Sequence, residues 1–134
     1  MLLSCRMLEN VVDANHFNYV QAMEFTEGDT PRIFLQLIDA SLDKAIAGFS
    51  PAGRRYMPDI GATLKVTFDN LDDAKKITRT AIQPFASDPS IWMIDLLTTD
   101  KVVGTITLRL ALTEGIVTTS GNLRAAIRVC VNQG

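Results

Sequence analysis

The chain is built from short stretches in which apolar and polar residues alternate. The clearest is PDIGATLKVTFDN (58–70), where Leu64, Val66 and Phe68 are apolar and the residues between them are polar. A period of two places successive side chains on opposite faces of a β-strand. Turn-forming Pro, Gly, Asp and Asn flank the stretch on both sides. The pattern therefore predicts a strand with one buried face and one solvated face.

Similar stretches recur along the rest of the chain, with turn residues between them. They are FNYVQAMEF (17–25), PRIFLQLIDA (31–40), KKITRTAIQPF (75–85), SIWMIDLL (90–97), TITLRLALTEG (105–115) and NLRAAIRVCVN (122–132). No segment longer than about ten residues has a helical period. About seven strands at this spacing are typical of an antiparallel β-sandwich or barrel. The sequence thus predicts an all-β protein.

Two stretches indicate where the centre of this structure lies. Residues 31–40 carry apolar side chains on both faces of the predicted strand, which favours a central position. Trp92 shares one face of its strand with Ile94 and Leu96, so we expect it to anchor the core rather than stack on a ligand. Between residues 41 and 58 the alternation breaks, and closely spaced Pro and Gly predict a long loop.

Length and composition fit one globular domain. The chain has 134 residues, of which 47% are hydrophobic and 21% charged, with a formal net charge of −2. Proteins that bind nucleic acid usually carry a basic patch, so we expect no nucleic-acid partner. No apolar run approaches the roughly 20 residues of a membrane span, so we expect no membrane partner. Residues 1–6 do not fit a signal peptide and are interpreted as an alternative start, a remnant or a mobile terminus.

Residue types that carry out catalysis or bind metals are sparse. His16 is the one histidine and has no cysteine near it in sequence, so we expect a partly exposed side chain and no zinc site. Cys5 and Cys130 lie at opposite ends of the chain, which favours reduced thiols over a disulfide framework. Two acidic groups occur, and they consist of Glu24, Glu27 and Asp29, and of Asp69, Asp72 and Asp73.

The second acidic group has two interpretations. The stretch DNLDD is faintly similar to oxygen-rich calcium loops, but it lacks their ligand spacing, mid-loop glycine and closing glutamate. A solvated turn accounts for it better, because Asp and Asn favour turn conformations. We therefore predict no catalytic residue, no cofactor, no cofactor-binding residue and no metal site, and we expect that the protein is not an enzyme.

The loop over residues 41–58 contains the stretch SPAGRRY. Arg54, Arg55 and Tyr56 have three interpretations, namely a protein interface, an ordinary exposed loop, or a phosphate site. The phosphate site is the least favoured, because no helix start follows to donate backbone N–H groups. Arginine and tyrosine are enriched at protein interfaces, so the interface is the preferred hypothesis.

Four short motifs carry a resemblance to a known family. They are Gly28-Asp29-Thr30, Leu37-x-Asp39, Gly61-Ala62-Thr63, and Thr98-x-Asp100 followed by Gly104. Together they resemble the N-terminal immunoglobulin-like domain of tailed-phage baseplate upper proteins, over most of residues 27–131. The resemblance implies an immunoglobulin-like β-sandwich and a structural protein of the virion, made in the host cytoplasm. A capsid decoration, neck, tail or baseplate accessory role fits it.

The resemblance also implies how the chain is divided and what it contacts. Residues 1–16 would form an N-terminal arm, extended or disordered when free, ahead of a single sandwich domain over 17–134. Partners would be copies of the chain and other virion structural proteins in a symmetric assembly. The candidate interface residues are Val11, Val12, Phe17, Tyr19, Arg54, Arg55 and Tyr56.

Two other function classes remain open from the sequence. A carbohydrate- or ligand-binding module is the main alternative, since β-sandwiches often serve that purpose. Such a module needs exposed aromatic side chains, and the chain has one Trp and two Tyr. An enzyme needs a general base, for which isolated carboxylates are the candidates.

Overall fold

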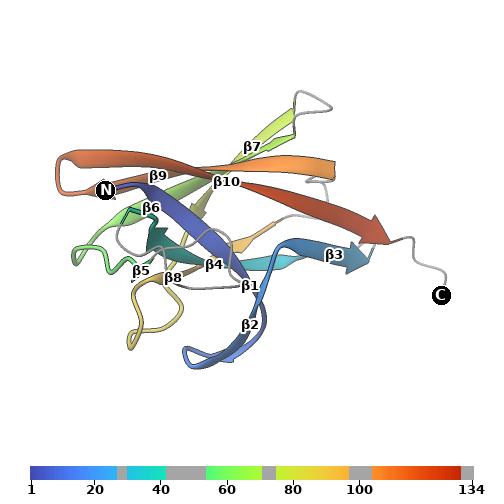
Figure 1. The fold of residues 1–134 in the computed structure, drawn as a ribbon, viewed down its shortest axis with the longest axis horizontal. Helices are drawn as coiled ribbons and strands as arrows, with labels where there is room; N and C mark the ends of the chain where they lie inside the picture. The colour runs from blue at the N-terminus through green and yellow to red at the C-terminus, as the bar shows by residue number, and fades with distance from the viewer. Residues whose placement is uncertain (27–29, 42–53, 71–74, 97–103, 131–134) are drawn as a thin grey trace.

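A computed structural model gives the fold, and it describes residues 1–26, 30–41, 54–70, 75–96 and 104–130. Ten strands occur in these ranges, with no helix among them (Figure 1). They are β1 (Leu3–Asp13), β2 (His16–Val20), β3 (Ala22–Thr26), β4 (Arg32–Asp39), β5 (Arg54–Arg55), β6 (Thr63–Asn70), β7 (Lys75–Ala81), β8 (Ile91–Asp95), β9 (Gly104–Glu114) and β10 (Val117–Cys130). The all-β prediction is confirmed. Accordingly, this part of the chain contains no helix long and apolar enough to span a membrane.

The strands form one sheet that folds over itself. Its hydrogen-bonded order is β5-β4-β1-β10-β9-β6-β7, with β8 beside β4, β2 beside β1 and β3 beside β10. At the end of β7, Ile82 and Met93 exchange two backbone hydrogen bonds of 3.0 and 2.8 Å, which join β7 to β8. Within the described residues, pairing therefore runs round a closed ring of strands: β4, β1, β10, β9, β6, β7 and β8.

The core lies between the two layers of this folded sheet. On β9, the alternating residues Ile106, Leu108, Leu110 and Leu112 are all buried, as the sequence pattern predicts. Trp92 on β8 is buried too, which confirms its place as a core residue. The other buried members of the core are Leu3, Cys5, Met7, Met23, Ile33, Leu35, Leu37, Leu64, Val66, Phe68, Ala81, Ile94, Leu96, Ala125 and Ile127.

The expectation of purely antiparallel pairing was wrong. β10 is parallel to β1, with Leu3 opposite Gly121, and parallel to β3 over residues 126–130. β1 leaves β10 after this first contact and pairs with β2 at Met7, Leu8 and Glu9. The segment β2–β3 thus fills the space that opens between the two diverging strands. Alternation reports which face of a strand is buried but not which strand lies beside it, so it gave no sign of this arrangement.

The structure also corrects the expected N-terminal arm over residues 1–16. Leu3–Asp13 forms β1, which pairs with β4 along six consecutive residues and lies inside the sheet. Leu3, Cys5 and Met7 alternate along β1 and are buried in the main core. Burying these apolar side chains stabilises the strand in the chain's own sheet, so an arm on a neighbour is not what these residues form.

The contact between β1 and β10 depends on a glycine. A Cβ atom on Gly121 would lie 2.2 Å from the carbonyl oxygen of Leu3 and 2.7 Å from its carbonyl carbon. Both are backbone atoms of a central strand, so the sheet itself would have to move. We expect Gly121→Ala to lower the free energy of unfolding by about 3 kcal/mol, as overpacking does.

Urea unfolding followed by circular dichroism measures this change. Ser120→Ala is the matched control, because Ser120 is the exposed neighbour of Gly121 on β10. Equal stability of the two variants would contradict the close approach of β1 to β10.

A second prediction concerns the thiol of Cys5 on β1. Burial raises the pKa of Cys5 to about 12, and the side chain has no exposed surface. The thiolate is the reactive form, so iodoacetamide at pH 8 should leave Cys5 unmodified in the folded protein and label it after denaturation. The experiment uses the Cys130→Ser variant, in which Cys5 is the one remaining thiol. Rapid labelling under native conditions would mean that β1 detaches as a mobile arm.

Candidate functional site

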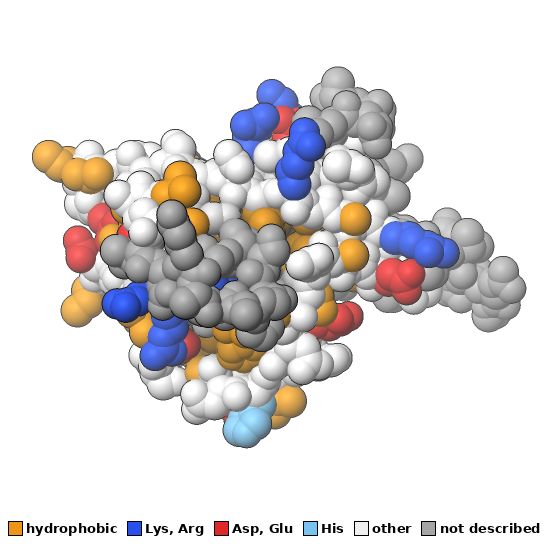
Figure 2. Space-filling model, in the orientation of Figure 1, with side chains coloured by type: hydrophobic (Ala, Val, Ile, Leu, Met, Phe, Trp, Pro, Cys, Tyr) orange, Lys and Arg blue, Asp and Glu red, His pale blue; other side chains and the backbone are white. Residues whose placement is uncertain are grey.

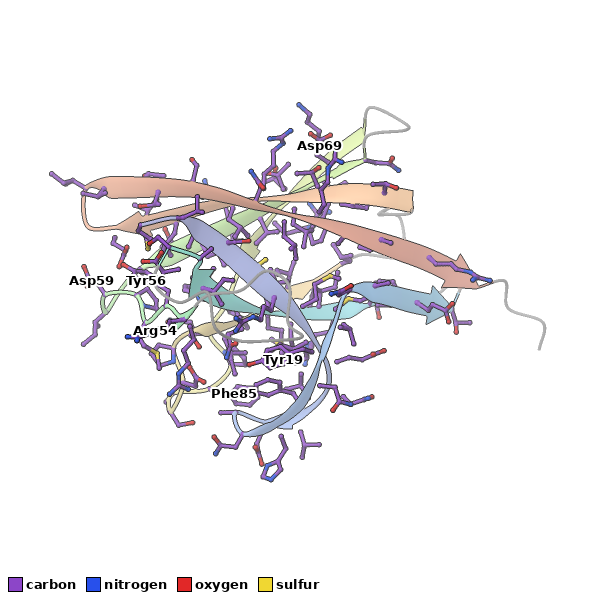
Figure 3. The ribbon with its side chains drawn as sticks, viewed as in Figure 1. Tyr19, Arg54, Tyr56, Asp59, Asp69 and Phe85 are labelled. Carbon is purple, nitrogen blue, oxygen red and sulfur yellow. The ribbon has the colours of Figure 1, made fainter. Side chains whose placement is uncertain are left out.

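Four of the predicted interface residues meet at one hollow on the surface. Phe17 and Tyr19 from β2 and Arg54 and Arg55 from β5 line it, although they are far apart in the sequence. The described part of the lining is completed by Arg6, Ala14, Asn15, Gln36 and Asp88. The hollow has a volume of about 620 Å³ and is open to solvent. Figure 3 shows Tyr19 and Arg54 on the side of β1 and β4 away from β9 and β10.

The floor of the hollow comes from the face of β1 and β4 that the main core leaves free. Arg6 and Gln36 are directly opposite each other in the pairing of these two strands. Their neighbours Cys5, Met7 and Leu35 point into the main core, so alternation directs Arg6 and Gln36 to the other face. Both are nonetheless buried, and Tyr19 on β2 contacts both of them.

One wall of the hollow is aromatic. The rings of Phe17 and Tyr19 meet edge to face, with centroids 5.4 Å apart and an interplanar angle of 80°. Both side chains pack on a small second core of Leu8, Ala14 and Ile91, to which Val11, Phe34 and Phe85 also contribute. The Tyr19 hydroxyl donates a 2.9 Å hydrogen bond to Oε1 of Gln36. The Arg6 guanidinium carbon lies 5.4 Å from the centre of the Tyr19 ring, within the range of a cation–π contact.

The opposite wall carries an ion pair. β5 pairs with the end of β4, which places Arg55 opposite Ile38. Arg55 Nη1 donates a 3.0 Å hydrogen bond to Oδ2 of Asp88, whose carboxylate is buried. Oδ1 of Asp88 accepts hydrogen bonds from the backbone N–H and the hydroxyl of Ser90, at 3.1 and 2.6 Å. Asp88 is therefore fixed from both sides and holds Arg55 at the rim.

This set of side chains is suited to binding. The described lining carries three guanidinium groups, one carboxylate, two amides and two aromatic rings. Guanidinium groups bind carboxylates and phosphates in a bidentate manner. Among the described residues, no three His, Cys, Asp or Glu side chains are placed together so that they could hold a metal ion.

The remaining predicted interface residues lie elsewhere. Val11 packs on the second core, and Val12 is 80% exposed near the tip of the β1–β2 hairpin. Tyr56 packs against the main core and takes no part in the hollow. His16 is exposed at the same hairpin, and its Nδ1 lies 2.7 Å from Oδ1 of Asp13.

The acidic groups singled out in the sequence are dispersed in the structure. Asp69 is buried on β6 and accepts a 3.0 Å hydrogen bond from Nε of Arg109 on β9. Glu24 on β3 lies 3.6 Å from Arg128 on β10. The other four, Glu27, Asp29, Asp72 and Asp73, lie outside the described residues.

A second surface feature had no clear signal in the sequence. Glu114, at the end of β9, accepts a hydrogen bond from the Tyr56 hydroxyl, which lies 2.8 and 2.9 Å from its two carboxylate oxygens, and another from the Asp59 backbone N–H at 2.9 Å. These bonds fasten the turn at residues 59–62 to the β9–β10 hairpin. Ile60 and Ile116, on these two turns, have relative exposures of 106% and 102%.

We call this region the end surface and define it as Met57, Ile60, Ile116 and Val117, all of which are exposed. Figure 2 shows apolar side chains standing out at this end of the molecule, at the left of the view. Gly61 and Gly115 could have indicated the two turns, since both adopt positive φ. Nothing in the local pattern indicates that the turns lie against each other.

Comparison with known proteins gives no relative. No protein family, curated protein or solved structure matches the chain. Any function must therefore be argued from the residues and their arrangement.

The contact between Tyr56 and Glu114 predicts a specific pH dependence. The hydrogen bond to Glu114, together with partial burial, raises the pKa of Tyr56 from 10.0 to about 12. The folded protein holds this proton more tightly than the unfolded chain, so the stabilisation is complete below pH 10 and is lost as the pH rises from 10 to 12. In Glu114→Gln we expect the pKa of Tyr56 to fall toward 10.

Tyrosinate absorbance near 295 nm during an alkaline titration measures this pKa. Tyr19→Phe in both backgrounds leaves Tyr56 as the one tyrosine, because the chain has two. An unchanged titration in Glu114→Gln would show that Glu114 does not clamp the two turns.

Proposed function

We propose that this chain is a non-enzymatic structural protein of a bacteriophage virion, which acts through contacts with copies of itself and with other virion proteins. In this proposal the folded sheet is an immunoglobulin-like β-sandwich, with the seven strands of the ring as its framework. The end surface is the observation that carries the proposal. In the virion the protein would serve as a capsid decoration protein or as an accessory protein of the neck, tail or baseplate.

The two isoleucines of the end surface lie on turns whose backbone is fixed by hydrogen bonds to Glu114. Single exposed apolar side chains are common on proteins and need no explanation. Here two fully exposed isoleucines lie on two turns that Glu114 links by accepting hydrogen bonds from two donors, the Tyr56 hydroxyl and the Asp59 backbone N–H. A surface that is already ordered loses little conformational entropy when a partner binds. Burial of these side chains against a partner would be favourable by about 25 cal/mol for each Å².

The phage assignment has a separate support. The turn motifs of the sequence resemble those of a baseplate immunoglobulin-like domain, and the described part of that region forms strands and turns. Gly61 opens the approach to β6 with a positive φ of 84°, as a turn of this kind requires. The structure adds a close-packed hydrophobic core between the two layers, which suits a rigid packing module.

Substitution of the two isoleucines tests the proposed contact. The double variant Ile60→Ser, Ile116→Ser should weaken self-association at least about 100-fold, since each buried isoleucine contributes about 1.5–3 kcal/mol. Its thermal unfolding midpoint should stay within about 2 °C of the wild type, because neither side chain contributes to the core. Sedimentation velocity over a range of concentrations measures the association.

The matched control is Val12→Ser, which replaces an exposed apolar residue near the tip of the β1–β2 hairpin, away from the β9–β10 turn (Figure 1). Wild-type protein that stays monomeric at every concentration would contradict self-association. Association that is equally strong in the double variant would show that the end surface is not the contact.

A further inference from the structure

Among the described residues that line the hollow beside β1 and β5, basic side chains outnumber acidic ones. Arg6, Arg54 and Arg55 outnumber Asp88 among the described lining residues, whereas the chain has a formal net charge of −2. The rim group Arg55 is 57% exposed at its side chain, so part of its guanidinium faces solvent. A locally positive concavity in an acidic protein attracts anionic groups.

Two of the three cationic groups in the described lining, Arg6 and Arg55, are also ordered before any ligand arrives. Arg55 is tied to Asp88, and Asp88 is tied to Ser90. Arg6 lies over the ring of Tyr19, whose hydroxyl is tied to Gln36. Side chains fixed in this way lose little further entropy on binding, which favours recognition of a defined group over a diffuse attraction.

The size and the walls of the hollow indicate a ligand larger than a single small anion. A volume of about 620 Å³ is in the range of pockets that hold whole ligands, about 300–1,000 Å³. The edge-to-face pair of Phe17 and Tyr19 offers apolar surface beside the guanidinium groups. An occupant that uses both features carries a carboxylate next to an apolar group.

We propose that this hollow binds an acidic segment of a partner protein, with a carboxylate on Arg54 and Arg55 and an adjacent apolar side chain on Phe17 and Tyr19. The choice of a protein segment as occupant rests on the proposed structural function, in which neighbouring subunits surround the chain. The hollow would then be a second contact, separate from the end surface.

Peptide binding to the purified protein tests this proposal. The probe is a blocked hexapeptide of alternating Glu and Leu, added to ¹⁵N-labelled protein, with the matched Gln–Leu peptide as the uncharged comparison. We expect the acidic peptide to shift the amide signals of Tyr19, Gln36 and Arg55, and its affinity to fall as salt is added. Arg54→Gln should weaken binding about tenfold, as loss of a charge-assisted hydrogen bond does.

Two further variants test whether the peptide binds at the hollow. Arg55→Gln should weaken binding by a similar factor, and a thermal melt of this variant shows whether the unpaired Asp88 has cost stability. Arg124→Gln, at an exposed position on β10, should bind the peptide as the wild type does.

Three results would overturn the proposal. They are no binding of the acidic peptide, equal binding of the Gln–Leu peptide, and inorganic phosphate binding at the same residues as tightly as the peptide does. The last result would reduce the hollow to a site for a small anion. The test uses neither Ile60 nor Ile116, so its failure and failure of the end-surface contact are separate outcomes.

Discussion

The contact between the first and last strands is the constraint on which the rest of the structure depends. Leu3 on β1 and Gly121 on β10 approach so closely that a side chain at position 121 would overlap the backbone of β1. This contact joins the two layers of the folded sheet on one side, and the bridge from Ile82 to Met93 joins them on the other. Together with the pairing of β3 to β10, it fixes β1 and the strands paired to it against β9 and β10.

The burial of one face of β1 also shapes the hollow. With Leu3, Cys5 and Met7 committed to the main core, the strand must turn Arg6 to its opposite face. There it meets Gln36, and the hairpin into β2 brings Tyr19 over both. Burying an arginine costs free energy of folding unless neighbouring groups compensate its charge. The aromatic and polar groups around Arg6 therefore help to offset the cost of burying it.

Much of the fold could be predicted because alternation marks buried faces directly. Residues 63–70 and 104–114 are strands with the predicted side chains inside, and Trp92 is a core residue. β1 was missed although Leu3, Cys5 and Met7 alternate, because the resemblance assigned residues 1–16 to an arm. The parallel pairing of β1 with β10 could not be predicted, because it joins residues more than a hundred positions apart and leaves no local signal in the sequence.

The candidate site was predictable in its parts and not as a whole. Phe17, Tyr19, Arg54 and Arg55 were singled out by residue type, and the structure brings them to one hollow. Gln36 belongs to a strand whose pattern predicts a core position, and Asp88 lies in a short turn. Neither position therefore indicated a binding site. The convergence depends on register and on which strands adjoin, neither of which a single sequence reveals.

The central claim is that the chain works as a part of an assembled particle. Quantitative mass spectrometry of purified phage particles, with the copy number of this chain set against that of the major capsid protein, tests it most directly. The account predicts a fixed and simple ratio, near one or a small fraction of one for a shell component, or the count of a single ring for a neck, tail or baseplate component. Absence of the chain from purified particles would contradict the account.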